Sequence, residues 1–202
     1  MNLERHADTI PSMGSAAIGP WLRRWASECS TNIVEVGSWL GAGTAQLALG
    51  ARMSGASIHV YDQWQANARE VRSAGLSGVE LQEGQDTLPL VRDFLKPFKA
   101  DITFHKGDIH QATWTGNPIG MYIDDAAKRP RAFHHVLKTF APSWEDGCIL
   151  VLMDFWYFES AGWRYRPQWL WSWLKRGRLE PLGDRFPGVS ARAFRYDASR
   201  TS

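Results

Sequence analysis

The chain has 202 residues, 44% hydrophobic and 22% charged, a composition typical of one ordinary folded domain. Its formal net charge of +2 is too small to indicate nucleic acid or an anionic membrane as the main partner. The two cysteines, Cys29 and Cys148, form no C-x-x-C pattern, which argues against a disulfide framework and a zinc site.

The first residues carry neither the basic start nor the apolar run of a signal peptide. No apolar stretch approaches the roughly 20 residues that a membrane-spanning helix needs. We therefore expect a cytoplasmic protein that has no membrane partner.

Apolar runs alternate with helical patterns, which is typical of βαβ units around a mainly parallel sheet. Strands are predicted at residues 32–36, 57–61, 101–105, 119–123 and 148–153. Helices are predicted at residues 16–28, 44–53, 88–98, 131–140 and 168–176. In the first helix, Arg23 and Arg24 are expected to face away from the core.

Two further segments complete the expected architecture. Residues 63–84 are polar and contain glycines, so they form either a long loop or a short helix. Residues 178–182 and 191–196 are expected to pair as a closing antiparallel hairpin. The fold class is thus α/β: a Rossmann-like, doubly wound, mainly parallel seven-stranded sheet with a C-terminal antiparallel hairpin.

The turn after the first strand carries the strongest signal. Glu35 precedes Gly37 and Ser38, and Gly41 follows at the start of the next helix. Glycines permit a tight turn and close approach to a ligand, and the free N–H groups of a helix N-terminus attract an anionic group. Asp62 ends the second strand, 21 residues after Gly41, where a carboxylate binds ribose hydroxyls. These residues predict a nucleotide-type cofactor site.

Acidic residues also follow the third and fourth predicted strands. Asp108 is placed to accept a hydrogen bond from an adenine amino group, and Ile109 to pack on the ring, although a capped turn explains them equally well. Asp124 and Asp125 follow the fourth strand, where ligands of open α/β sheets bind. We assign Asp124 to the cofactor side.

Three residues are candidates for the chemical step. Asp125 and Lys128 lie three apart on a predicted first helical turn and so share a face. His105 and His110 flank the end of the third strand, and either could act as a base, because histidine ordinarily titrates near neutrality; His110 is the one chosen. Asp125, Lys128 and His110 are therefore the candidate catalytic residues, and the alternative for the first two is an acid-decorated helix start.

Tryptophan is abundant, with 11 residues, five of them between Trp156 and Trp173. These side chains could form an aromatic wall for an acceptor substrate, because indole suits stacking on sugars and rings. Ordinary packing explains them equally well.

An NAD(P)-binding oxidoreductase is the main alternative function, because such a protein also binds ribose hydroxyls with an acidic residue at the end of the second strand. The glycine spacing here is G-x-x-x-G-x-G, however, and not G-x-G-x-x-G. No Tyr-x-x-x-Lys pair is available for a short-chain dehydrogenase.

Residues 34–44 resemble motif I of class I S-adenosylmethionine-dependent methyltransferases, in the variant of the macrocin and cephalosporin-type small-molecule O-methyltransferases. Residues 60–62, 106–108 and 125–128 extend the likeness in the same order, over about residues 32–155. The resemblance implies S-adenosylmethionine as cofactor. It also implies methyl transfer to an oxygen of a small molecule such as a sugar or natural product.

The resemblance further implies how a single methyltransferase domain, residues 1–202, is divided. An N-terminal helical segment spans residues 1–30, the cofactor-binding core residues 31–155, and a Trp-rich acceptor-side helix with the closing hairpin residues 156–202. A catalytically inactive binding module with the same fold stays open, as do the acceptor and the oligomeric state.

One departure from the family pattern concerns metal. Metal-dependent members carry a pair of carboxylates after the fifth strand, whereas Met153 precedes Asp154 here. Mg²⁺ is therefore doubtful, with Asp125 and Asp154 as weak candidate ligands, too few for its usual near-octahedral oxygen shell.

Overall fold

A computed structural model describes residues 2–14, 16–155, 168–183, 186 and 188–200. The strands are β1 (Asn32–Val36), β2 (Ser57–Asp62), β3 (Ile102–Lys106), β4 (Ile119–Asp124), β5 (Trp144–Met153), β6 (Leu179–Pro181) and β7 (Ala191–Tyr196). They form one sheet in the order β3-β2-β1-β4-β5-β7-β6. Neighbours from β3 to β5 are parallel, and β7 runs antiparallel to both β5 and β6. The predicted fold class is confirmed.

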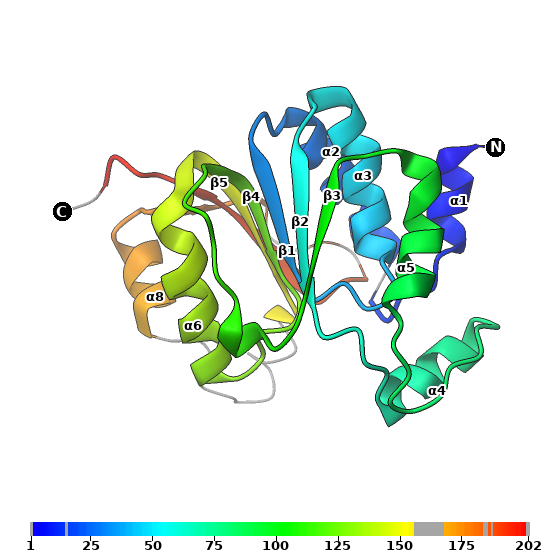
Figure 1. The fold of residues 1–202 in the computed structure, drawn as a ribbon. Helices are drawn as coiled ribbons and strands as arrows, with labels where there is room; N and C mark the ends of the chain where they lie inside the picture. The colour runs from blue at the N-terminus through cyan, green and yellow to red at the C-terminus, as the bar shows by residue number, and fades with distance from the viewer. Residues whose placement is uncertain (1, 15, 156–167, 184–185, 187, 201–202) are drawn as a thin grey trace.

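Helices cover both faces of this sheet (Figure 1). They are α1 (Leu3–Thr9), α2 (Gly19–Glu28), α3 (Ala42–Ser54), α4 (Ala68–Leu76), α5 (Leu88–Leu95), α6 (Pro130–Phe140) and α8 (Gln168–Lys175). In Figure 1, α1, α2, α3 and α5 lie on one side of the sheet, with α6 and α8 on the other. Short 3-10 turns occur at Ala16–Ile18, Lys96–Phe98, Ile109–Gln111 and Ala141–Ser143. Among the described residues, none of the helices has both the length and the apolar character that a membrane crossing needs.

The predicted elements recur with small shifts at their ends, and two differences are larger. α1, a short helix capped by the Asn2 side chain, was not predicted. β5 begins at Trp144, four residues before the predicted start. The polar stretch after β2, predicted as a long loop or a short helix, contains the short helix α4, which begins with a reciprocal capping box between Asn67 and Glu70.

The strand order places a switch point between β1 and β4. The chain leaves β1 through α3 on one face of the sheet and leaves β4 through α6 on the other (Figure 1). A crevice opens at the carboxyl ends of strands where the direction of winding reverses. The fold therefore puts its natural binding crevice between residues that follow Val36 and residues that follow Asp124.

The helix pair α2 and α3 packs at very short range. A Cβ atom on Gly50 would lie 2.2 Å from the carbonyl oxygen of Arg23 and 2.7 Å from the Cβ of Ala26. Only glycine fits there, because the obstacle is the backbone of the neighbouring helix. This close contact lets α2 carry the segment before it to the edge of the crevice.

The side chain of Arg23 differs from the prediction that it faces solvent. It donates hydrogen bonds to Glu4 in α1 and, at 3.0 and 3.3 Å, to the buried amide oxygen of Gln46 in α3. The Gln46 amide in turn donates to Asp8, with 3.3 Å between the two atoms. Arg23 turns inward because these partners, distant in sequence, pair with its guanidinium, and the resulting chain of bonds ties α1 to the helix pair.

We predict that Gly50→Ala destabilises the protein by at least about 2 kcal/mol, because the added methyl group meets immovable backbone. Gly75 in α4 is the matched control, since no atom lies within 4 Å of a Cβ built there. Gly75→Ala should be neutral or stabilise the protein by up to about 1 kcal/mol through helix propensity. Urea unfolding of both variants measures the difference, and equal effects would contradict the packing argument.

Candidate functional site

A cavity of about 1140 Å³ occupies the crevice at the carboxyl ends of the strands. This volume slightly exceeds the range of roughly 300–1,000 Å³ usual for a pocket that holds one small ligand. Its wall includes residues that follow β1, β2, β3, β4 and β5, together with parts of α3, α4 and the N-terminal segment. The predicted residues that line it are Glu35, Gly37, Ser38, Asp62, Asp108, Ile109, Asp125, Lys128 and Asp154.

The turn after β1 adopts the backbone that its glycines allow. Gly37 has φ of 87° and Gly41 has φ of 88°, both in the left-handed region that favours glycine. A Cβ on Gly37 would lie only 2.7 Å from the Cβ of Ala126, so the turns after β1 and β4 nearly touch. Gly41 stands just before α3 and provides no side-chain cap, which leaves the first N–H groups of that helix without one.

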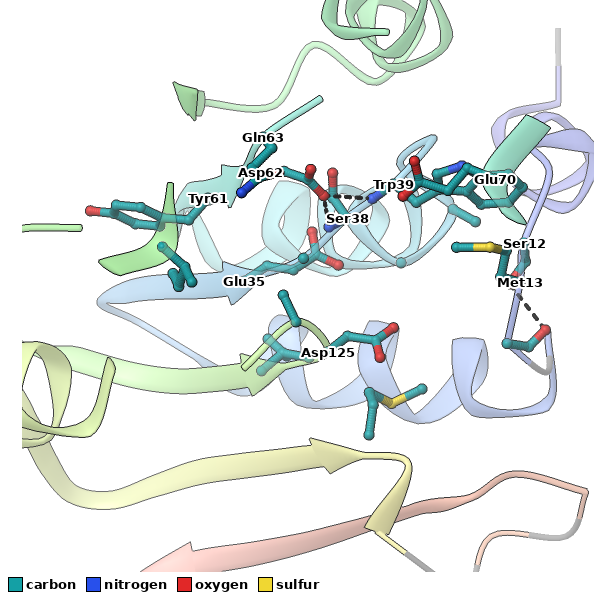
Figure 2. A pocket seen from close by; sticks show the side chains of 18 of the residues that line it. Ser12, Met13, Glu35, Ser38, Trp39, Tyr61, Asp62, Gln63, Glu70 and Asp125 are labelled. Atoms are coloured by element: carbon teal, nitrogen blue, oxygen red, sulfur yellow. Dashed lines mark hydrogen bonds between the residues drawn. The ribbon is translucent and has the colours of Figure 1, made fainter. Parts of the chain in front are cut away.

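Asp62 organises this turn directly (Figure 2). Its Oδ2 accepts hydrogen bonds from the backbone N–H groups of Ser38 and Trp39, at 2.8 and 2.9 Å. Its Oδ1 accepts one from the N–H of Trp64 at 2.9 Å. The carboxylate therefore has a structural task that the sequence analysis did not foresee, in addition to its place on the cavity wall.

Glu35 is almost fully buried at the base of the cavity, 3% exposed. The hydroxyl of Thr44 donates a hydrogen bond to its Oε2, and a Cβ on Gly43 would meet its Oε1 at 2.6 Å. Burial raises the pKa of Glu35 to about 8, helped by the carboxylates of Asp125 and Asp62 and opposed by the Thr44 hydroxyl. Near neutral pH this carboxyl group is therefore largely protonated.

Asp124 and Asp125, adjacent in sequence, have different surroundings. Asp124 is 4% exposed and absent from the cavity wall, and its Oδ1 accepts from the N–H groups of Ala126 and Ala127. Burial raises the pKa of Asp124 to about 6, against the lowering effect of Lys128 and of these N–H groups. Asp124 thus supports the turn from inside, whereas Asp125 lines the cavity (Figure 2).

Lys128 links the ends of β4 and β5. Its Nζ lies 2.7 Å from Oδ1 of Asp125 and 3.0 Å from Oδ2 of Asp154. The side chains of Asp125 and Lys128 are 44% and 28% exposed, and both line the cavity. Burial lowers the pKa of Lys128, but Asp125, Asp154 and Asp124 together outweigh it and raise the pKa above its usual value. Lys128 is therefore held as an ammonium ion, and the structure brings the predicted pair together.

The end of β3 forms another part of the wall. Asp108 caps the 3-10 turn that follows by accepting from the N–H of His110, and Asp108 and Ile109 both line the cavity. His110 is exposed and does not line the cavity. It lies beside His135, with 6.3 Å between ring centroids, so the structure does not bring it to Asp125 and Lys128.

His105 occupies the cavity wall that was considered for His110. Its ring stacks on Tyr61 with 4.2 Å between centroids, and its Nε2 lies 3.2 Å from Nδ1 of His59. Burial lowers the pKa of His105, and the neighbouring His59 adds to the fall. The imidazole is thus neutral at physiological pH and held in place on two sides.

Sequence reasoning missed the N-terminal segment and α4 as parts of this site. Residues 10–14 and Asp8 line the cavity beside α2, and Figure 2 shows Ser12 and Met13 at one end of it. Arg69 and Glu70 of α4 line it from the loop side. A short helix was one of the two alternatives for residues 63–84, and the capping pattern of Asn67 and Glu70 is the signal that could have located it.

The proposed aromatic acceptor wall falls mostly outside the described residues, since residues 156–167 and the side chains of residues 168–171 are not described. Trp173 is described, and it packs on Trp144 and Tyr196 with centroid distances of 6.0 and 5.9 Å. Trp173 therefore belongs to the core beside α6.

The residues present do not form a convincing metal site. Within the described part of the chain, no group of three or more His, Cys, Asp or Glu side chains is arranged to hold a metal ion. Asp125 and Asp154 face each other across the Lys128 ammonium, which already balances part of their negative charge.

A protein-family model described as a methyltransferase domain matches residues 34–155 of the chain. Among solved structures, the O-methyltransferase NovP is similar over 90% of this chain and 80% of its own, with 14% identity and a TM-score of 0.63. A methyltransferase of Podospora anserina, PaMTH1, solved with bound S-adenosylhomocysteine, is 11% identical over 96% of this chain and 87% of its own (TM-score 0.61).

CalS11, a TDP-rhamnose 3'-O-methyltransferase of calicheamicin biosynthesis, is 14% identical over 88% of this chain and 76% of its own, with a TM-score of 0.54. At these identities the solved structures establish a shared fold. A search of curated proteins found no match.

We predict that Asp62→Ala destabilises the protein without any ligand, by about 1.5–3 kcal/mol, because the N–H groups of Ser38, Trp39 and Trp64 lose a charged acceptor. Asp93, exposed on α5, is the control, and Asp93→Ala should stay within about 0.5 kcal/mol. Denaturant unfolding of the empty protein measures both. Unchanged stability of the Asp62 variant would mean that the turn keeps its shape unaided.

Glu35 should make stability depend on pH. Its pKa is about 8 in the fold and near 4.5 in an unfolded chain, so the fold binds the extra proton between these values. Stability must then fall as pH rises from about 5 to 8, by an amount on the order of 3 kcal/mol. In Glu35→Gln, the part of the pH dependence of the free energy of unfolding that Glu35 causes should vanish, while the part that Asp124 causes should remain. Identical slopes for both proteins between pH 5 and 8 would contradict the burial argument.

Proposed function

The chain belongs to the methyltransferase domain family, with S-adenosylmethionine as methyl donor, and from this premise we propose that it is an active O-methyltransferase of small molecules. One observation carries the proposal. The cavity has two chemically different halves, a glycine turn with Glu35 and Asp62 on one side, and Asp125, Lys128 and Asp154 on the other.

The first half suits the cofactor. Glu35 ionises when a cation approaches, so it can receive the ammonium group of the methionine part. The uncapped start of α3 beyond Gly41 offers N–H groups to the methionine carboxylate. Asp62 accepts one hydrogen bond at Oδ1, so that oxygen has room for a ribose hydroxyl. Asp108 and Ile109 line the adenine end.

The second half suits the acceptor and its proton. In the transfer, the acceptor oxygen attacks the sulfonium methyl carbon as the bond from that carbon to sulfur breaks. S-adenosylhomocysteine leaves, and the acceptor proton passes to a carboxylate, Asp125 or Asp154. Lys128 cannot take this proton, since it is already an ammonium ion. Most of the rate gain comes from alignment in a sheltered cavity.

Cavity size and the fold relatives support the proposed acceptor class. A volume of about 1140 Å³ leaves room for an acceptor beside the cofactor. NovP is an O-methyltransferase and CalS11 acts on a TDP-sugar, which supports a sugar or natural-product acceptor for this chain. His110 lies outside the wall, and we assign it no step.

Calorimetry tests the cofactor: S-adenosylhomocysteine should bind at least 100-fold more tightly than NAD⁺, because the G-x-x-x-G-x-G turn and Glu35 suit a methionine-bearing nucleoside. Tight NAD⁺ binding alone would instead establish an oxidoreductase. Transfer is then measured with methyl-labelled S-adenosylmethionine and a panel of sugars, glycosides and phenols. Cofactor binding without label transfer across the panel would favour an inactive binding module.

A further inference from the structure

The arrangement at the ends of β4 and β5 places one cation between two carboxylates. Asp124 and Leu152 are the last residues that pair between these strands, so Asp125 and Asp154 follow the two neighbouring strand ends. The Nζ of Lys128 lies 2.7 Å from one carboxylate and 3.0 Å from the other. These are the only charge partners of Lys128 within 4 Å among the described residues.

The carboxylate of Asp154 is held where it is by its backbone. Asp154 has φ of 56°, a left-handed conformation that costs a residue other than glycine about 1–3 kcal/mol. The residues on either side are anchored: Met153 pairs with Ala191 in the sheet, and the N–H of Phe155 donates to the carbonyl of Ser190. Such strain persists only where the surroundings enforce it, and it turns Asp154 toward Lys128.

The turn that carries Asp125 and Lys128 is equally fixed. The N–H of Asp125 donates to the carbonyl of Val36 at 2.8 Å, and the N–H of Lys128 to that of Ala126 at 2.7 Å. The buried carboxylate of Asp124 accepts from the turn beneath them. The backbone that carries these charged side chains is therefore fixed, and the ion pairs with Asp125 and Asp154 hold the Lys128 ammonium.

We propose that the ammonium of Lys128 is a built-in cation that takes the place of a divalent metal ion between Asp125 and Asp154. A divalent ion there would sit within a few ångströms of the ammonium, and the repulsion between like charges would oppose its binding. The pair also supplies too few oxygen ligands for the near-octahedral shell of Mg²⁺.

The presence of an ammonium group in place of a metal ion limits how the acceptor can bind, and this inference about the acceptor rests on the proposed function. A metal ion can bind two neighbouring oxygens of a substrate at once. An ammonium group has three N–H donors, and two are used by Asp125 and Asp154, which leaves one for a single acceptor oxygen. The acceptor therefore needs only one hydroxyl group at this point, and a second, neighbouring hydroxyl, as in a vicinal diol or a catechol, is not required for binding.

Mn²⁺, followed by electron paramagnetic resonance, is the probe because it shares the ligand preferences of Mg²⁺. The native protein should bind it no more tightly than about 1 mM, the weak end of carboxylate sites. Lys128→Met should bind it at least 10-fold more tightly, since both carboxylates lose their cation. Adding Asp154→Asn to that variant should remove the gain.

Lys106, which lines the same cavity and pairs with Asp86 at 2.7 Å, is the matched control, and Lys106→Met should not gain Mn²⁺ binding. Tight binding by the native protein, abolished by Asp154→Asn, would overturn the proposal, as would unchanged weak binding by a folded Lys128→Met. Calorimetry with S-adenosylhomocysteine on the same samples tests the proposed function separately, because cofactor affinity should not depend on Lys128.

Discussion

The close approach of two turns is the constraint on which the rest of the site depends. A side chain at Gly37 would collide with Ala126, and the N–H of Asp125 donates to the carbonyl of Val36 at 2.8 Å. The ends of β1 and β4 are thereby locked together just where the chain departs to opposite faces of the sheet. Residues that follow each strand must then face one shared cavity, so Glu35 and Asp125 belong to one site although 90 residues separate them.

Four carboxyl groups of the cavity wall differ in how their negative charge is balanced. Asp62 accepts backbone N–H groups, whereas Asp125 and Asp154 share the ammonium of Lys128. Glu35 has neither kind of partner and retains its proton instead, because burial raises its pKa to about 8. Glu35 is thus poised to change charge near neutral pH, and a bound cation such as a sulfonium compound with its ammonium group would favour its ionised form.

The parts of the fold that the sequence predicted are those with local causes. Alternating apolar runs predicted every strand, and the glycines at 37 and 41 predicted the turn, because periodicity and left-handed backbone are properties of short segments. The N-terminal segment and α4 were not assigned to the site, since contacts distant in sequence bring them there. Asp8, for example, reaches the cavity through a hydrogen bond from Gln46, 38 residues away. The cytoplasmic location stays a prediction.

Position after a strand predicts which residues approach a site, but it does not predict which way each side chain faces. Asp124 and Asp125 both follow β4, yet one is a buried cap for the turn and the other lines the cavity. His110 follows β3, where the 3-10 turn capped by Asp108 directs it to solvent, while His105 inside the strand reaches the wall. Local backbone geometry at a strand end therefore decides whether a polar residue supports the site or acts in it, and hydrogen bonds to the turn are what set that geometry.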